Sequence, residues 1–233
     1  MKKASGRRHS HSRLRPPAPL SPRKSPLQER SQATVDAILQ GASQVLVRVG
    51  YERANTTLIA RAAGVSVGSL YQYYPNKDAV FGALLRAELA QGHAVMRAAL
   101  EATAQLPLEA GVHRLVHALC GYKASNPRLH RVLKTELGRI DGAKALRRLN
   151  EQTLALIGDL LREHQRELCL ADPTRAAFVL VNAVDGVVCA ALLEPEVGLG
   201  EAGFVRELSE GALAMLRSLP RLEVPLQSAG AHE

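Results

Sequence analysis

The segment from Thr56 to Lys77 constrains the fold of this chain most strongly, because two helix beginnings and two helix ends fall within it. Thr56 precedes an apolar run at helical spacing and can cap a helix by accepting backbone N–H bonds. Gly64 follows that run, where a glycine can end a helix in the left-handed conformation. Ser66 can cap a second helix, which Pro75 stops. The segment therefore predicts two short helices joined by a tight turn, the form of a DNA-binding helix-turn-helix.

The second of these helices is polar, aromatic and nearly without charge. Leu70 and Tyr74 lie four residues apart, so both are expected to face inward toward the first helix. The residues left to face outward are Val67, Gly68, Ser69, Tyr71, Gln72 and Tyr73. Asn76 can then cap a third helix that begins at Lys77. The outward face is thus the candidate reading surface for a DNA groove.

The same segment resembles the DNA-reading motif of the TetR-type repressor family, and Ile38 to Asn55 resembles the first helix and Gly-Tyr linker of that family. The agreement extends over residues 30 to 90 or so. It rests on Ile38, Ala42, Gly50, Tyr51, Thr57, Ile59, Ala60, Ala63, Gly64, Val65, Ser66, Gly68, Leu70, Tyr71, Tyr74 and Lys77. The departures, at Val47, Tyr74 and Val80, change packing volume and leave the reading surface alone. The alternative is an ordinary helical hairpin whose agreement with the motif is accidental.

The resemblance implies DNA backbone and groove contacts from Thr57, Ser69, Tyr71, Tyr73 and Lys77. Hydroxyl groups and a lysine near a helix N-terminus also suit phosphate oxygens on chemical grounds. The full set of DNA-binding residues that we predict is Thr56, Thr57, Ser66, Val67, Gly68, Ser69, Tyr71, Gln72, Tyr73 and Lys77.

Base reading by this helix is expected to be modest. Gln72 can bond an adenine edge in two places, and Val67 can touch a thymine methyl group. No arginine lies on the helix, so specificity is expected to depend partly on DNA shape or on Arg53 or Arg61 nearby. The alternative for Gln72 and Tyr73 is a solvated helix face.

The basic charge of the chain is concentrated at its N-terminus. Residues 1–27 hold eight of the 30 lysines and arginines and no acid, while the remainder has 22 basic and 22 acidic residues. This segment is also rich in Ser and Pro, so we expect a disordered basic arm that can follow phosphates or enter a minor groove. The alternatives are a solvated extension without function and an organellar transit peptide, whose amphipathic helix the prolines would spoil.

The rest of the chain predicts an all-α fold, since it is 46% hydrophobic, has no tryptophan and is sparse in turn residues outside its ends. The expected division is residues 28–76 as a three-helix helix-turn-helix domain, 77–220 as a helical regulatory and dimerisation domain, and 221–233 as a flexible tail. The later helices are expected at 77–103, 107–125, 128–139, 142–168, 173–193 and 204–219. No apolar run approaches the 18 to 20 residues or so of a membrane span, so no membrane partner and a cytoplasmic location are expected.

The helix from Pro173 to Leu193 is apolar nearly all round, so both of its sides must be covered. A second copy of the chain is the expected cover for one side. The resemblance implies that this helix and the last one pair with their copies in a four-helix dimer interface, which would set two recognition helices about 34–36 Å apart on an imperfect palindrome. The predicted interface residues are Leu180, Val184, Val187, Ala191, Phe204, Leu208 and Met215.

Asn182 and Asp185 interrupt the same helix, and buried polar groups need partners. The resemblance implies a cavity for a small-molecule effector that releases DNA, and we predict that these two line it. The other predicted lining residues are Arg114, His117, Tyr122 and Glu136. The alternative is that Asn182 and Asp185 bond across the dimer or cap neighbouring helices.

Cysteine and histidine indicate little chemistry. Three cysteines without paired spacing suit reduced thiols in a core. His113, His117 and Cys120 share one helical face and are three of the four ligands that zinc needs, although such triplets are usually incidental, so no metal or cofactor is expected. No catalytic or nucleotide-binding motif is present, so an enzyme is not expected. We predict a dimeric DNA-binding transcriptional repressor, whose partners are an operator, its own copy and an unidentified effector. The alternative is a small-molecule or redox-sensing helical protein whose DNA contact is secondary.

Overall fold

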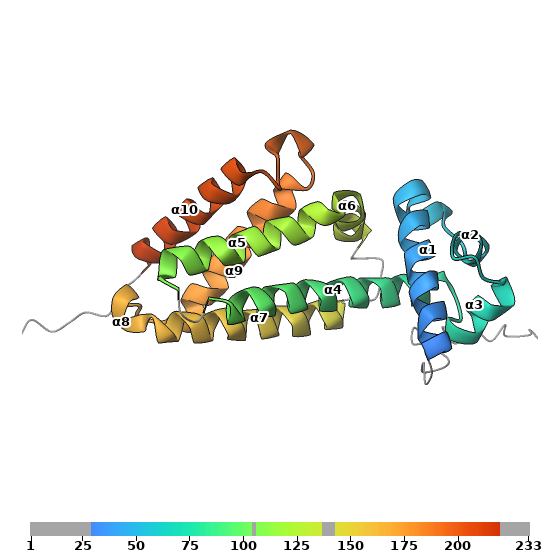
Figure 1. Cartoon of the computed structure of the whole chain (residues 1–233), viewed down its shortest axis with the longest axis horizontal. Coiled ribbons are helices and arrows are strands. Elements are labelled where there is room, and N and C mark those ends of the chain that lie inside the picture. Colours follow the sequence, from blue (N-terminus) through green and yellow to red (C-terminus); the bar gives the residue numbers. More distant parts are fainter. Residues whose placement is uncertain (1–28, 104–105, 137–142, 220–233) are drawn as a thin grey trace, which may run out of the picture.

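The computed structural model describes residues 29–103, 106–136 and 143–219, and in this part of the chain every regular element is helical (Figure 1). The helices are α1 (Glu29–Arg53), α2 (Thr56–Ala62), α3 (Val67–Tyr73), α4 (Lys77–Glu101), α5 (Leu108–Ser125), α6 (Pro127–Glu136), α7 (Ala143–Glu163), α8 (Gln165–Leu168), α9 (Pro173–Ala191) and α10 (Ala202–Ser218), with a 3-10 turn at Pro195–Val197. The predicted all-α fold is confirmed. The basic arm predicted at 1–27 and the tail predicted at 221–233 lie outside the described residues.

A first hydrophobic core joins α1, α2 and α3 to the beginning of α4. Ile38, Ile59 and Leu70 are fully buried in it. Gly41 of α1 allows the close approach of α2, because a Cβ atom there would lie 2.7 Å from the backbone nitrogen of Ala63. In Figure 1, α1, α2 and α3 form the right-hand end of the molecule, and α4 runs from there toward the other end.

The caps of the short helices differ from expectation at one position. Asn55 caps α2, since its side chain accepts a hydrogen bond from Leu58 N at 2.9 Å, so the prediction that Thr56 is the cap was wrong. An amide one residue earlier satisfies the same free N–H groups equally well. Ser66 and Asn76 cap α3 and α4 as predicted.

The first core extends beyond the helix-turn-helix. Val80, Phe81 and Leu84 of α4 are buried in it, and so are Leu129 and Leu133 of α6, although α6 comes far later in the sequence. The boundary that we expected between residues 76 and 77 therefore lies at the start of a helix that packs into both halves of the molecule. Arg131 fixes the other side of α6, because its Nε donates a 2.7 Å hydrogen bond to the carbonyl oxygen of Leu192 at the end of α9.

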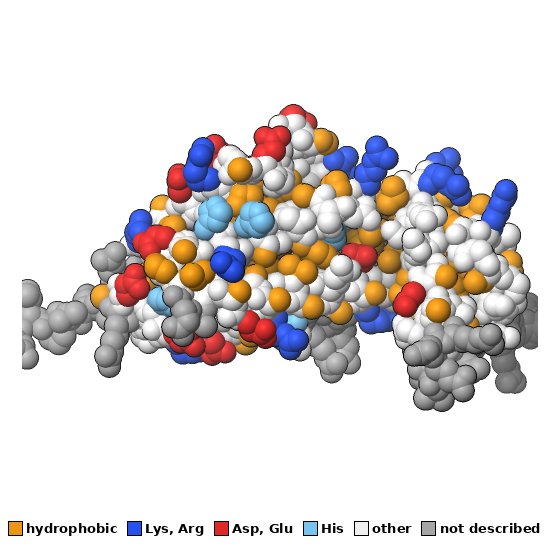
Figure 2. Space-filling view, viewed as in Figure 1, with side chains coloured by type: hydrophobic (Ala, Val, Ile, Leu, Met, Phe, Trp, Pro, Cys, Tyr) orange, Lys and Arg blue, Asp and Glu red, His pale blue; other side chains and the backbone are white. Residues whose placement is uncertain are grey.

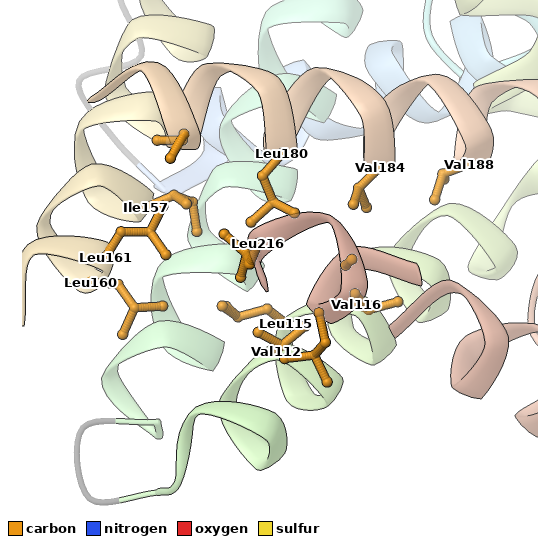
Figure 3. Close-up of a cluster of buried hydrophobic side chains, with 14 of the residues drawn as sticks. Val112, Leu115, Val116, Ile157, Leu160, Leu161, Leu180, Val184, Val188 and Leu216 are labelled. Carbon is orange, nitrogen blue, oxygen red and sulfur yellow. The ribbon is translucent and has the colours of Figure 1, made fainter. Parts of the chain in front are cut away.

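A second hydrophobic core lies among α5, α7, α9 and α10. Figure 3 shows Leu180, Val184 and Val188 pointing from α9 toward α5 and α10, where Leu216 and Val116 meet them. Ile157, Leu160 and Leu161 close this core from α7 (Figure 3). The helices around this second core thus form a bundle beside the first core, and α4 and α6 join the two.

The helix expected at 142–168 is divided in the structure. It breaks at His164, whose Nδ1 lies 3.1 Å from the carbonyl oxygen of Leu160, and α8 then ends at Cys169 with a φ of 52°. No proline or glycine marks this break, so the sequence pattern did not reveal it.

Among the described residues, α9 is long and apolar enough to cross a membrane by length and composition alone. Core helices of soluble proteins commonly share this property. Here Ala177, Leu180 and Val188 pack into the second core, which accounts for the apolar character of the inward side.

Candidate DNA-binding surface and internal cavity

The exposed side of α3 presents a compact polar surface. Ser66 Oγ accepts a hydrogen bond from Ser69 N at 2.9 Å and lies 2.8 Å from Ser69 Oγ, which fixes the first turn of the helix. Tyr71 is 40% exposed, and Gln72 and Gly68 are exposed beside it. These side chains can reach a groove without rearrangement of the helix.

The predicted residues of α2 lie next to this surface. Thr57 is exposed, and Thr56 Oγ1 lies 3.1 Å from the hydroxyl oxygen of Tyr71. This hydrogen bond joins the beginning of α2 to α3 and restricts the rotation of the Tyr71 ring. Val67 is half-buried at the start of α3.

The outward placement expected for Tyr73 was wrong. Its side chain is buried, and its hydroxyl oxygen lies 2.9 Å from Ser31 Oγ of α1. Leu70, Tyr73 and Tyr74 are spaced three and four residues apart, so all three fall on the side of α3 that packs inward. Tyr73 therefore secures α3 against the start of α1, whereas Tyr71 and Gln72 remain on the exposed side.

Lys77 has a structural role in addition to its predicted contact with DNA. Its Nζ donates hydrogen bonds to the carbonyl oxygens of Tyr51 at 3.0 Å and Glu52 at 3.4 Å, and lies 4.6 Å from the centre of the Tyr51 ring. A cation near carbonyl groups at the end of α1 is favourable. The Tyr51 hydroxyl donates to Asp78 at 2.7 Å, and burial and this bond raise the pKa of Tyr51 to about 12. These polar contacts thus hold the end of α1 against the start of α4.

Basic side chains surround this end of the molecule. Arg48, Arg53 and Arg61 are exposed, and Figure 2 shows Lys and Arg side chains along its upper edge. Arg48 and Arg61 also border a small depression with Gln44 between α1 and α2. Positive charge near the exposed side of α3 favours approach of the phosphate backbone.

The second core encloses a cavity of about 620 Å³ among α4, α5, α6, α7, α9 and α10. Of the predicted lining residues, Tyr122, Asn182 and Asp185 border this cavity. Arg114 and His117 do not, because they lie on the exposed side of α5. Glu136, near the end of α6, does not border it either, so the prediction was wrong for these three positions. Figure 3 shows the apolar part of the wall, which includes Val112, Leu115, Leu160 and Leu216.

Several polar lining residues were missed by the sequence reasoning: Glu88, His93, Lys123, His130 and Lys134. The Tyr122 hydroxyl donates to the Glu88 carbonyl oxygen at 2.5 Å and to Glu88 Oε2 at 3.2 Å. Gly92 permits this contact, since a Cβ atom there would lie 2.8 Å from the Tyr122 ring. In the sequence, Gly92 one turn after Glu88 could have indicated a close contact at this point of α4. It does not by itself indicate that the contact is with Tyr122 on another helix.

His130 of α6 meets this cluster edge-on, with its ring centre 4.7 Å from that of Tyr122. Burial, together with the charge of Lys123, lowers the pKa of His130 to about 4. The imidazole is therefore uncharged at neutral pH.

The predicted dimer residues of α9 divide between the two sides of the helix. Leu180, Val184 and Ala191 are buried within the chain, so their assignment to an interface was wrong. Their spacing of four and seven residues places them on the inward side, whereas Val187 and Phe178 are 45% and 56% exposed. On α10, Phe204, Leu208 and Met215 are half-buried.

The predicted histidine and cysteine triplet does not form one site. His113 and His117 are exposed and their rings stack at 6.4 Å, but Cys120 is fully buried in the second core. Within the described residues, no three His, Cys, Asp or Glu side chains are grouped to hold a metal ion.

Cys120 and Cys189 are expected to react slowly with an aromatic disulfide reagent at neutral pH, and the half-exposed Cys169 to react first. Burial raises the pKa of Cys120 to about 11, and burial together with the negative charge of Asp185 raises the pKa of Cys189. Because the thiolate is the reactive form, both rates should rise with pH well above neutrality. Mass spectrometry of the labelled peptides would rank the sites. Rapid labelling of Cys189 would contradict this and favour a redox sensor.

Comparison with known proteins agrees with this geometry. Residues 38–84 match the model of the bacterial regulatory proteins of the tetR family, and residues 107–216 match the tetracyclin repressor-like C-terminal domain. The HTH-type transcriptional regulator BetI of Vibrio parahaemolyticus is 28% identical over 170 residues, which span 68% of this chain and 80% of that protein.

Solved structures of similar fold cover most of the chain. The fatty acid degradation regulator FadR from Bacillus halodurans has a TM-score of 0.66 at 24% identity and covers 82% of this chain and 96% of its own. SmeT in its complex with triclosan has a TM-score of 0.56 at 25% identity, with 78% of this chain and 91% of its own covered.

Proposed function

Because this chain belongs to the TetR family of DNA-binding transcriptional regulators, we propose that it is a repressor that a small molecule releases from a palindromic operator. We propose further that it acts in the cytoplasm as a homodimer and has no catalytic activity of its own. The observation that carries the proposal is the exposed side of α3, where Tyr71 and Gln72 are accessible beside the turn that Ser66 caps.

Exposed apolar side chains on α9 and just after it support the dimer. Phe178, Val187 and Leu193 are large apolar side chains that remain 56%, 45% and 50% exposed in one chain. Gly186 lies on the same helix, and a Cβ atom there would meet nothing within 4 Å. Apolar side chains beside a small residue permit close packing of two helices, and a two-fold dimer brings the same surface from each copy together. We therefore propose Phe178 and Val187 as interface residues in place of Leu180, Val184 and Ala191.

The cavity supports regulation by a small molecule. Its volume of about 620 Å³ lies in the range of pockets for drug-sized ligands. A relative, SmeT, has been seen with triclosan bound. If an effector lowers the affinity for DNA, the DNA-bound dimer must bind that effector less tightly by the same factor.

Fluorescence anisotropy with DNA from immediately upstream of the gene would test the proposal. Saturable binding that survives competitor DNA is expected, with two chains for each operator. Titration across a salt series, with and without residues 1–27, would also report on the arm, because each phosphate contact adds to the salt dependence. Binding that is weak, indifferent to sequence and abolished by salt would contradict a specific repressor of this gene.

Tyr71→Phe is expected to weaken operator binding about tenfold, because it removes only the hydroxyl that can bond a phosphate oxygen. Tyr71→Ala should weaken it further through loss of the ring. Since the hydroxyl contacts only Thr56 at the surface, the melting temperature of Tyr71→Phe should stay close to that of the wild type, which makes thermal unfolding the control. Unchanged affinity of Tyr71→Phe for the operator would show that the hydroxyl makes no phosphate contact.

A further inference from the structure

The wall of the cavity changes from apolar to polar along its length. Toward α7 and the end of α10 it is formed by Met96, Leu108, Val112, Leu115, Leu160 and Leu216. Near α6 it is formed by Glu88, His93, Tyr122, Lys123, His130 and Asp185. Tyr122 lies at the centre of this polar group. Its hydroxyl bonds Glu88, its ring contacts that of His130, and the Lys123 ammonium lies 5.7 Å from the centre of the same ring. Such a wall fits an elongated molecule with one apolar and one polar end.

The carboxyl group of Glu88 lines the polar end of this cavity. The side chain is half-buried, and burial raises the pKa of its carboxyl. The hydroxyl of Tyr122 reaches Oε2, but among the described residues no Lys, Arg or His nitrogen lies within 4 Å of the Glu88 carboxylate to form an ion pair. The charge of Lys123 acts on this carboxyl from beyond ion-pair distance and, with the Tyr122 bond, lowers its pKa against the effect of burial. A ligand that places a cation in direct contact with the carboxylate would stabilise it further.

The lysines of the polar end can satisfy their charges without a ligand. Lys134 is exposed, and Lys123 is half-exposed above the Tyr122 ring. Long lysine side chains bury their methylene groups and extend the ammonium into water, which a glutamate held beside the helix backbone cannot do. A cationic ligand can therefore bind the Glu88 carboxylate while the ammonium groups of Lys123 and Lys134, which also line the cavity, extend into water.

Two further groups favour a donor on the ligand. His93 Nε2 is buried and has no hydrogen-bond partner among the described residues. Its side chain borders the same cavity, five residues after Glu88 on α4. His130 is uncharged, so it does not repel a cation, and the faces of aromatic rings attract one.

We propose that the effector is an amphiphilic organic amine, whose protonated nitrogen binds the Glu88 carboxylate and His93 Nε2 and whose apolar part lies between α5, α7 and α10. This inference rests on the proposed function, since it names the class of molecule for that cavity. The ammonium supplies the donor that His93 Nε2 lacks, and it gives the Glu88 carboxylate, which already accepts from Tyr122, a cation in direct contact.

Isothermal titration of the purified dimer with octylamine, octanol and octanoate, all below micelle formation, would test the proposal. The three probes share one chain and differ only in the polar group. Octylamine is expected to bind about tenfold more tightly than octanol, as suits one charge-assisted hydrogen bond, and octanoate more weakly than both. Octanoate as the tightest ligand, or no measurable binding of octylamine by a folded dimer, would overturn the proposal.

The decisive variant is Glu88→Gln, which keeps the size of the side chain and leaves the Tyr122 bond to the backbone carbonyl in place. It should reduce octylamine affinity about tenfold, to that of octanol, and leave octanol unchanged. Glu101→Gln is the matched control, because Glu101 lies on the same helix but is exposed and pairs with Arg97. If Glu88→Gln and Glu101→Gln bind octylamine equally well, Glu88 does not bind the amine.

A second variant separates the cavity from its polar end. Met96→Trp fills the apolar part of the wall and should weaken octylamine and octanol by the same factor. An unchanged octylamine affinity in this variant would place the amine outside the cavity and overturn the proposal. Parallel anisotropy measurements distinguish this proposal from the proposed function, because a chain that binds no operator fails the latter even when octylamine binds as expected.

Discussion

Replacement of Leu129 by alanine is expected to lower the free energy of unfolding by about 2–5 kcal/mol, the range for a large aliphatic side chain removed from a rigid core. Leu129 lies on α6, yet its side chain is 1% exposed and belongs to the core of the DNA-binding end. The cavity left behind would face α1 and α4, so the variant should also lose operator affinity. Urea unfolding followed by circular dichroism, at one fixed chain concentration, would measure the change.

Arg128→Ala provides the control for this prediction. Arg128 is the preceding residue on α6 and is exposed, so its replacement should change the free energy of unfolding by no more than about 0.5 kcal/mol. A Leu129→Ala variant as stable as Arg128→Ala would mean that α6 does not belong to the first core.

The second large effect is expected at Gly41, where alanine should destabilise the chain although it favours helices. Its Cβ atom would lie 2.7 Å from Ala63 N and 3.0 Å from Ala63 Cα, and backbone atoms cannot move aside as a flexible side chain can. Overpacking of this kind costs about 1–3 kcal/mol, against a gain of about 0.5–1 kcal/mol from replacing a helical glycine. Since α2 would be pushed away from α1, operator binding should fall as well.

Gly121→Ala tests the same substitution where there is room. Gly121 is exposed near the C-terminal end of α5, four residues before its last residue, and a Cβ atom there would meet nothing within 4 Å. Its replacement should therefore raise the free energy of unfolding by about 0.5–1 kcal/mol. The two alanines are expected to act with opposite signs in thermal unfolding, and a stabilising Gly41→Ala would show that α1 and α2 are not in tight contact.

The helix-turn-helix could be predicted from the sequence because its signals are local. Ser66, Pro75 and Asn76 mark helix ends by chemistry that acts within one turn of the chain. Tyr73 was misplaced although it follows Leu70 by three residues, because the partner of its hydroxyl, Ser31 of α1, is distant in the sequence. Spacing alone left Tyr73 and Tyr74 equally able to face inward.

The cavity and the exposed side of α9 could be predicted only in part. Asn182 and Asp185 were visible as polar interruptions of an apolar helix, but the inward side of α9 depends on where α5, α7 and α10 lie. No local sequence pattern marks Glu88 or His130 as a cavity residue. They line the same cavity only because α4, α5 and α6 meet in the folded chain. The division of the helix at His164 carried no local signal.

The packing of α6 has a consequence for how such regulators can be recombined. A graft that exchanges residues 28–76 between two relatives would leave Leu129 and Leu133 facing side chains with which they did not evolve. The unit that can be transplanted must therefore include the inner side of α6, which is separated from α3 by the whole of α4 and α5 in the chain. Exchange of operator specificity between two such chains is therefore expected to need a redesigned α6 as well as a redesigned α3.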